Sequence, residues 1–262
     1  MMFRRTLAAA ALLAGLSALP QPAAAQTVDE ITRKGEIVVA IDLTNPPWGF
    51  LDAQQQPTGF DPAFAALLAE KLGVKLRIER VNSPGRIPFL QSGRVDVVIS
   101  TLSVTHERAR QVWFTNPYAP NPLLLIAEKA KPWRSYADLN GVRIAVPRGS
   151  PQDLTVTRMA PGATIMRFDD DASAQQALLT GQADMLGGGL LVPGTLNRMA
   201  PGREYEGKIV LNELFMSMAV RKGNADLLQY LNTFLFLVKQ SGELDALTRQ
   251  HLQVPTPNLP VF

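Results

Sequence analysis

The sequence has no cysteine among its 262 residues and only two histidines, His106 and His251. The absence of cysteine excludes disulfides, thiolate metal sites, cysteine nucleophiles and a lipidated N-terminal cysteine. Both histidines stand among polar neighbours in segments of helical character, and neither has a second potential ligand at helical spacing. We expect both at the surface, and we predict neither a metal site nor a bound cofactor.

A strong excess of one charge is also missing. The chain has 26 Lys and Arg against 23 Asp and Glu, a formal net charge of +3, and it contains no run of basic residues. The basic stripe that binds phosphate backbones is therefore absent, which argues against a nucleic-acid partner. The patterns of serine hydrolases, phosphate-binding loops and dinucleotide-binding folds are missing too, since Gly187–Gly189 lacks their spacing. No catalytic residue is predicted.

Long hydrophobic runs are confined to the N-terminus. The basic start Met1–Arg5 precedes the apolar run Leu7–Leu19, and Ala23–Ala25 has the small residues of a signal-peptidase site. The apolar run is shorter than the roughly 20 residues that a bilayer span needs. We expect residues 1–25 to be a cleaved export signal, and the remainder to be a soluble, monomeric protein of the bacterial periplasm.

Short apolar runs alternate with helix start signals along the remainder of the chain. Runs of this kind are typical of strands buried on both faces. The start signals are Asp61, Thr105, Ser150 and Asp171, each ahead of a helical pattern. This alternation favours an α/β fold with parallel sheets. The predicted strands are Glu36–Ile41, Val95–Ser100, Val142–Val146 and Ala183–Leu186.

One pattern occurs twice. Leu90–Asp96 and Leu179–Asp184 both have the sequence of a helix end, a glycine cap and a short turn, and an apolar strand follows each. Two similar α/β lobes would produce this repetition. Such units also recur in unrelated α/β proteins, so the residues alone leave both explanations open.

A hydroxyl-rich segment follows the second predicted strand, where ligands meet the loops of an open parallel sheet. Ser100–Thr105 has hydroxyls at four of six positions, and Arg108 follows on the next helical turn. Hydroxyls, backbone N–H groups and a guanidinium that binds two oxygens favour a carboxylate receptor. The alternative is that Thr105 merely caps its helix and Arg108 is solvated.

Two further loops carry suitable side chains. Arg148, Gly149 and Ser150 offer a positive charge and backbone donors, although Ser150 is also explained as a helix cap. After the first strand, Asp42 is suited to an ammonium group and Trp48 to a pocket wall, in a loop stiffened by two prolines. Trp48 is equally explained as a core residue.

A series of short motifs runs through about Gly35–Leu252. They are Val39–Asp42 with Pro46–Trp48, Gly59–Asp61, Arg86–Pro88, Gly93–Asp96, Ser100–Arg108, Phe114–Tyr118, Leu139–Gly141, Ala219–Gly223 and Ser241–Gly242. Each is weak alone, but in this order the set resembles the polar amino acid family of bacterial extracytoplasmic solute-binding proteins, the capture components of ABC importers.

The resemblance implies a type II periplasmic-binding-protein fold, in which two α/β lobes enclose a central ligand cleft and close about a two-segment hinge. Lobe 1 would comprise residues 27–119 and 218–262, and lobe 2 residues 124–214. The hinge would lie near 120–123 and 215–217. The implied function is capture of an amino acid or related small carboxylate for the membrane permease of an ABC importer.

Roles for individual residues are implied as well. Arg108 would bind the ligand α-carboxylate, helped by Ser103 and by the backbone near Ser100 and Thr101. Ser150 would assist from lobe 2. The residues facing the variable part of the ligand would be Asp42, Asn45, Ser83 and Arg86.

The sequence also departs from the family pattern. Gly189 stands where the family usually has the aspartate that binds the α-ammonium, Asn45 replaces an aromatic residue, and Pro151 replaces a threonine. An α-amino acid bound in the usual way is therefore in question. The alternative is an ordinary ammonium solvated by water and by the carbonyls of Gly187–Gly189.

The arginines bear on the charge of the ligand. Arg86, in an Arg-Ile-Pro setting, is similar to the arginine of family members that bind acidic amino acids. Together with Arg108 and Arg148, it favours an anionic ligand.

An enzyme on the same scaffold is the main alternative, because the resemblance extends to periplasmic cyclohexadienyl and arogenate dehydratases. Their chemistry needs an acid or base that projects from lobe 2 toward the leaving group. Gly187–Leu191 offers no carboxylate there, so we expect a binding protein rather than an enzyme. A receptor's sensor domain would require a membrane span and an output domain, and we expect neither in this chain.

Overall fold

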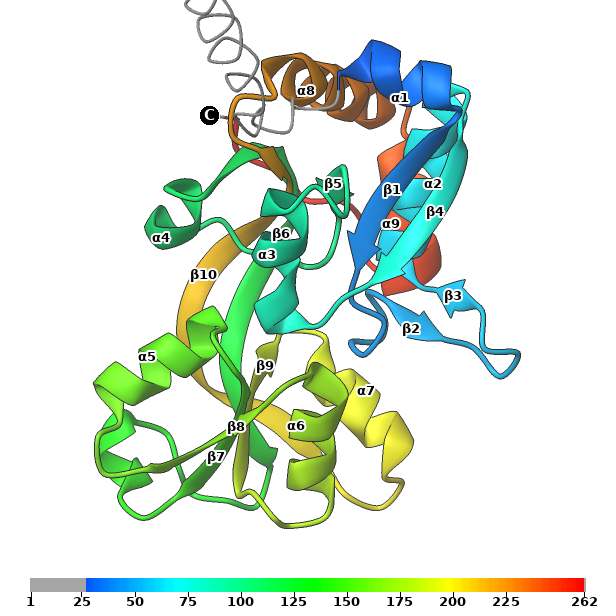
Figure 1. Ribbon diagram of the computed structural model, residues 1–262. Coiled ribbons are helices and arrows are strands. Elements are labelled where there is room, and N and C mark those ends of the chain that lie inside the picture. The colour runs from blue at the N-terminus through cyan, green and yellow to red at the C-terminus, as the bar shows by residue number, and fades with distance from the viewer. Residues whose placement is uncertain (1–26, 262) are drawn as a thin grey trace, which may run out of the picture.

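The computed structural model describes residues 27–261, so the predicted export signal lies outside the described residues. Within them, one mixed sheet has the strand order β4-β1-β5-β10-β6-β9-β7-β8, and the hairpin β2–β3 is separate (Figure 1). The strands are β1 (Glu36–Ile41), β2 (Phe50–Leu51), β3 (Pro57–Thr58), β4 (Lys75–Arg80), β5 (Val97–Val98), β6 (Val112–Glu128), β7 (Arg143–Pro147), β8 (Thr164–Phe168), β9 (Met185–Gly189) and β10 (Tyr205–Arg221).

The helices of the described part are too short or too polar to cross a membrane. They are α1 (Val28–Lys34), α2 (Phe60–Leu72), α3 (Arg86–Gln91), α4 (His106–Ala109), α5 (Pro151–Met159), α6 (Asp171–Leu179), α7 (Val192–Met199), α8 (Ala225–Gln240) and α9 (Glu243–Leu252), with 3-10 turns η1 (Ser83–Gly85) and η2 (Tyr136–Leu139).

Two of the four predicted start signals cap their helices. The hydroxyls of Thr105 and Ser150 accept the backbone N–H three residues on, at 3.2 Å in both cases. The other two signals are displaced. Helix α2 begins after Gly59, which places Asp61 within its first turn, and Asp170 rather than Asp171 caps α6. Asp171 is consequently the first residue of its helix, with a side chain that is free for another contact.

The first half of the sheet has β1 at its centre, paired in parallel with β4 and β5. Because strand residues alternate between faces, Val39 and Ile41 pack with α2, α8 and α9, whereas Val38 and Ala40 pack with Leu90 of α3. Strand β1 has the predicted bounds, but β5 covers only the middle of the predicted run at 95–100.

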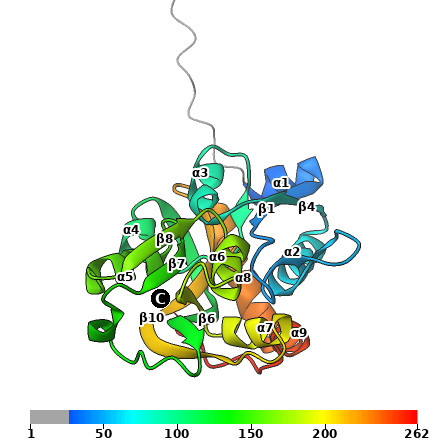
Figure 2. The same cartoon turned by 90° about the horizontal axis from the view of Figure 1, so that it is seen from below.

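The second half repeats this arrangement, with β7 at the centre and paired in parallel with β8 and β9. Figure 2 shows α5 and α6 on either side of these strands, and two separate apolar clusters fill the two faces. The twice-occurring pattern falls at matching places: α3, Gly93 and β5 in one half, α6, Gly181 and β9 in the other. Both glycines have φ of +76°, a left-handed conformation that favours glycine.

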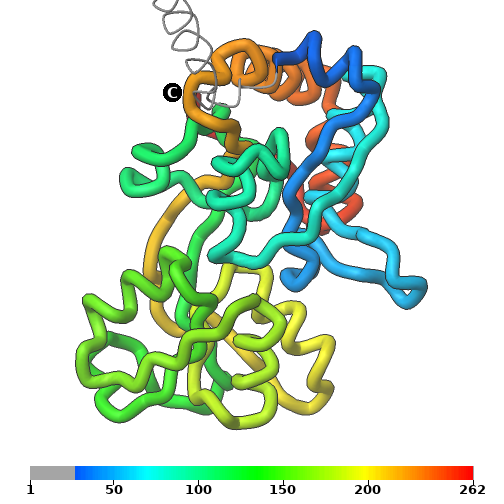
Figure 3. Tube along the Cα trace, viewed as in Figure 1, coloured from blue at the N-terminus to red at the C-terminus, as the bar shows by residue number. Residues whose placement is uncertain are grey.

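Strands β6 and β10 join the two halves. They are antiparallel partners from Val112↔Arg221 to Glu128↔Tyr205, and both run from one half of the molecule into the other (Figure 3). The sheet is therefore mixed, where parallel sheets were predicted. The pattern Pro117, Pro120, Pro122 in β6 indicates turns rather than a strand. The ribbon accommodates the prolines with shifts in register, including two around Ser217.

Candidate functional site

A cavity lies between the two halves of the molecule, against the β6–β10 ribbon. It has a volume of about 30 Å³, which is room for only a few water molecules. A larger hollow of about 630 Å³ adjoins it, and Ser83, Arg108 and Pro151 line both. The cavity is lined by Asn45, Trp48, Ser83, Arg86, Thr101, Ser103, Arg108, Asn121, Leu123, Ser150, Pro151, Gln152, Asp171, Gly189, Val192 and Met216.

Arg108 is a buried positive charge at the cavity that forms no ion pair within the described chain. Its helix begins at the Thr105 cap, which directs the side chain inward, and the residue is 8% exposed. Nη1 donates to the Ser103 carbonyl at 3.0 Å, and no carboxylate within residues 27–261 forms an ion pair with it. Burial, with the charge of Arg86, lowers the pKa of Arg108 to about 9. A ligand carboxylate would relieve this desolvated charge.

The guanidinium of Arg86 donates more hydrogen bonds than that of Arg108, all within its own lobe. It donates to the Ser83 carbonyl at 3.2 Å, to the Ser83 hydroxyl at 2.9 Å and to the Ser100 carbonyl at 2.7 Å. It thereby joins η1 to the end of β5. Burial raises the pKa of Asp42, and the positive charge of Arg86 opposes that rise. The charge of Arg86 therefore acts partly on this neighbouring carboxyl.

The hydroxyl-rich segment has a strained backbone. Thr101 has φ of +45°, which is rare for a β-branched residue, and its N–H donates to Asp61 Oδ2 at 3.1 Å. The Tyr118 hydroxyl donates to the other oxygen of Asp61 at 3.2 Å. Burial raises the pKa of Asp61 to about 7. Asp61, which was predicted only as a helix start, thus helps to fix the segment that lines the cavity.

The second lobe presents α5 and the end of β9. Pro151 begins α5, and Gln152, 7% exposed, faces the cavity. Gly187 allows this approach, because a Cβ there would lie 3.1 Å from the Gln152 side chain. At Gly189 the nearest atom to a Cβ would be Asn121 Oδ1 at 3.5 Å, an ordinary contact distance. Strand β9 extends to Gly189, three residues beyond the predicted strand end at Leu186.

Four predicted residues do not line the cavity. Arg148 is exposed and pairs with Asp169 at 3.3 Å, so it adds no charge there. Gly149 borders the larger hollow, and its N–H donates to Asp153. Ser100 and Asp42 lie just behind the wall, where the Ser100 hydroxyl accepts the Asp42 N–H at 2.9 Å.

Sequence reasoning missed three polar residues that the structure places at the cavity: Asn121, Gln152 and Asp171. Asn121 donates from Nδ2 to the Ser103 hydroxyl at 2.8 Å. Asp171 was assigned to helix capping, and the adjacent Asp169 and Asp170 made that role ambiguous. The sequence signal that could have identified Asp171 is the run of three aspartates at 169–171. A helix needs only one of them as its N-cap, which leaves the others for different contacts.

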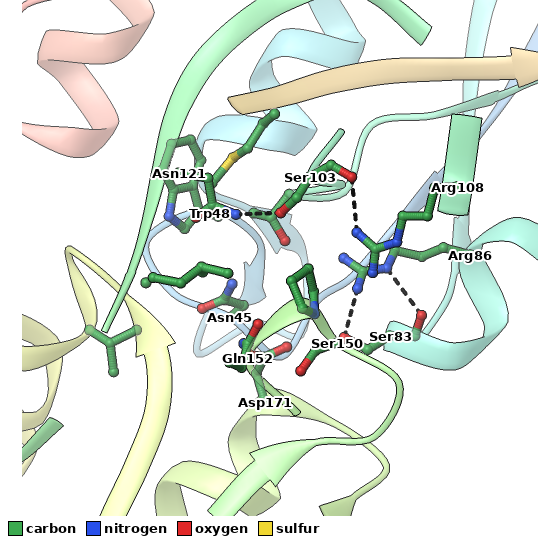
Figure 4. A pocket seen from close by; sticks show the side chains of 16 residues that line it. Asn45, Trp48, Ser83, Arg86, Ser103, Arg108, Asn121, Ser150, Gln152 and Asp171 are labelled. Atoms are coloured by element: carbon green, nitrogen blue, oxygen red, sulfur yellow. Dashed lines mark hydrogen bonds between the residues drawn. The ribbon is translucent and has the colours of Figure 1, made fainter. Parts of the chain in front are cut away.

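The loop after β1 contributes one wall of the cavity (Figure 4). Trp48 is both a core residue and part of the cavity wall, because its ring makes an edge contact with Phe60 in the core and also faces the cavity. Asn45 Oδ1 is buried and has no hydrogen-bond partner in the described chain. Residues 27–261 contain no group of three or more histidines or carboxylates that could hold a metal ion.

Comparisons with known proteins show the family to which the chain is related. The model of bacterial extracellular solute-binding proteins, family 3, matches residues 37–254. The L-cystine-binding protein of Escherichia coli (strain K12) is 27% identical over 92% of this chain and 91% of its own. A putative ABC transporter arginine-binding protein of the same organism is 29% identical over 93% and 97%.

One solved structure and one enzyme complete the comparison. The solute receptor for L-cysteine of Neisseria gonorrhoeae has a TM-score of 0.81 and 30% identity, over 86% of this chain and 93% of that one. This likeness confirms the expected two-lobe type II periplasmic-binding-protein fold. Cyclohexadienyl dehydratase of Pseudomonas aeruginosa is 28% identical over 70% of both chains.

Proposed function

The chain belongs to family 3 of the bacterial extracellular solute-binding proteins, and we propose that it captures an amino acid or related small carboxylate in the periplasm for the membrane permease of an ABC importer. The observation that carries the proposal is Arg108, a buried guanidinium at the lobe interface that has no anionic partner among residues 27–261. Relatives named for cystine, cysteine and arginine support an amino-acid ligand.

The site residues that we propose follow from the cavity. Arg108, Ser103 and Thr101 would bind the carboxylate, and Asn45 and Trp48 would contact the rest of the ligand. Ser83, Arg86, Ser150 and Gly189 would complete the wall, whereas Arg148 and Gly149 are left out. With Arg148 outside, the arginine charge at the cavity is smaller than the sequence suggested.

A ligand screen tests this function. Residues 26–262 would be heated with L-cystine, L-cysteine, L-arginine, L-glutamine or L-glutamate, each also as the analogue without its amino group. A ligand present at 100 times its Kd stabilises the folded state by about 2.7 kcal/mol and should raise Tm clearly. Failure of every amino acid and carboxylate at millimolar concentration would overturn the proposal.

An enzymatic function is the second candidate, because Asp171 now supplies a lobe-2 carboxyl that Gly187–Leu191 lacks. Incubation with arogenate separates the two functions, since a dehydratase releases water and carbon dioxide and forms an aromatic ring that absorbs in the ultraviolet. We propose that no such product forms.

Closure of the lobes is part of the proposed mechanism. The cavity is too small to admit an amino acid as it stands, whereas the adjoining hollow is open. We place the hinge near 120–123 and 215–217, between lobe 1 (27–119 and 218–262) and lobe 2 (124–214). Irregular register around Ser217 supports bending there.

Small-angle scattering tests this closure. We expect a smaller radius of gyration when the tightest ligand from the screen is saturating, because a ligand favours the closed state only as far as it binds that state more tightly. Identical profiles with and without that ligand would contradict closure.

A further inference from the structure

The cavity lacks an anion at the position where relatives are expected to have one. Gly189, at the end of β9, has no side chain that could bind a ligand. The nearest atom to a Cβ at this position would be Asn121 Oδ1, at 3.5 Å. An amino-acid ligand would nevertheless bring an ammonium into a narrow cavity between the lobes. A desolvated ammonium without an anionic or acceptor partner is costly, so another group must take this role.

The three consecutive aspartates at the start of α6, Asp169, Asp170 and Asp171, make different contacts. Asp169 pairs with Arg148 at the surface, and the Asp170 side chain accepts the Ser173 N–H at 2.7 Å as the helix cap. Asp171 forms neither a surface ion pair nor the helix cap. It lines the cavity as the first residue of the helix, next to the Ser83 hydroxyl of the opposite lobe.

Hydrogen-bond acceptors gather around Asp171. Figure 4 shows Asn45, Gln152 and Asp171 grouped in one part of the cavity, with Arg86 and Arg108 in another. Asn45 Oδ1 is buried without a partner in residues 27–261, so this acceptor is available to a ligand. The cavity thus has a donor side and an acceptor side, the arrangement that a zwitterion requires.

We propose that the Asp171 carboxylate, together with the amide oxygen of Asn45, binds the α-ammonium of an amino-acid ligand from lobe 2, in place of the missing aspartate at position 189. This inference rests on the proposed function. It makes the substrate class α-amino acids rather than carboxylates without an amino group.

The charges around Asp171 fit this role. Burial and the negative charge of Asp42 raise the pKa of Asp171 to about 7, while Arg86 and the Ser83 hydroxyl oppose the rise. Asp170 adds a further negative charge from the helix cap. An ammonium would favour the ionised carboxyl and lower this pKa, so binding would release a proton.

The experiment compares Asp171→Asn with the control Asp169→Asn, which removes a carboxylate two residues away whose side chain is 74% exposed. Each protein is titrated calorimetrically with L-cystine and 3,3′-dithiodipropionate, and with L-arginine and 5-guanidinopentanoate. Each pair differs in its α-amino groups. The unsubstituted protein and D169N should prefer the amino form, and D171N should lose ten- to hundredfold of that preference.

The pH dependence supplies a readout that a structural role would not move. Between pH 7.5 and 5.5, protonation of Asp171 should weaken the amino-bearing probe by up to tenfold per unit below the free pKa, and D171N should remove that decline. Asp42 and Asp61 remain in both proteins. Because the charges of Asp42 and Asp171 act on each other, the difference between the two profiles reports the titration of Asp171 together with its effect on Asp42.

A second variant tests whether D171N acts by removing a carboxylate or by perturbing the local structure. Gly189→Asp, added to D171N, places a carboxylate where the family pattern has one and should restore part of the preference for the amino form. The inference is overturned if D171N keeps the full preference, or if it weakens both members of a pair equally. If neither amino acids nor their analogues bind the unsubstituted protein, the proposed function itself fails.

Discussion

Arg108→Ala is expected to weaken amino-acid binding by about 2–5 kcal/mol, because it removes one partner of a desolvated, hydrogen-bonded charge pair. Only one hydrogen bond, to the Ser103 carbonyl, occupies this guanidinium within the described chain, so most of its donors are available to a carboxylate. Arg108→Lys should recover part of the loss at most, since an ammonium lacks the planar fork that binds two oxygens.

Calorimetry with the tightest ligand from the screen measures this effect. Arg110→Ala is the matched control, because Arg110 is exposed at the end of the same helix, α4, and the change removes the same charge. Its Kd should stay within about twofold of the unsubstituted protein. Equal Kd values for R108A and R110A would show that Arg108 is not the carboxylate anchor.

Phe64→Ala is expected to lower the free energy of unfolding by about 3–5 kcal/mol, the usual cost of removing a fully buried ring. Phe64 is 0% exposed, and its ring lies 5.4–5.6 Å from the rings of Phe60, Tyr118 and Phe234. Phe60 in turn contacts Trp48 at the cavity wall. The loss should therefore also loosen that wall.

Urea unfolding followed by circular dichroism checks the prediction. The control is Phe236→Ala on α8, the same substitution at a side chain that is 58% exposed, and it should change stability by less than about 0.5 kcal/mol. Should F64A cost no more than F236A, the aromatic cluster would not be the main stabilising element of lobe 1.

The parts of the fold that could be predicted depend on short-range patterns. Strand β1 and the caps at Thr105 and Ser150 are visible in the sequence, because apolar runs and capping hydroxyls act locally. The β6–β10 ribbon was missed because its three prolines look like turns, and only pairing over a long sequence distance makes a strand of them.

The site was predictable to the same extent. Arg108 lines the cavity, and it was singled out because a hydroxyl-rich loop and a helix start lie beside it in the sequence. Arg148, which was predicted as a site residue, lies outside the cavity, whereas Asp171, which was not, lines it, because neighbouring residues decide where each side chain points. Asp169 attracts Arg148 to the surface, and Asp170 takes the cap that Asp171 was expected to form.

The ribbon has a consequence for how the molecule could be rebuilt. Pro122 of β6 and Glu213 of β10 are direct antiparallel partners, so the chain enters and leaves the second lobe at adjacent points. Between them lie two apolar clusters whose buried residues all fall within residues 123–211. The second lobe is in effect an insertion into the first. Exchanging residues 123–212 with those of a relative would replace Gln152, Asp171 and Gly189 as one block while Arg108 stays in place.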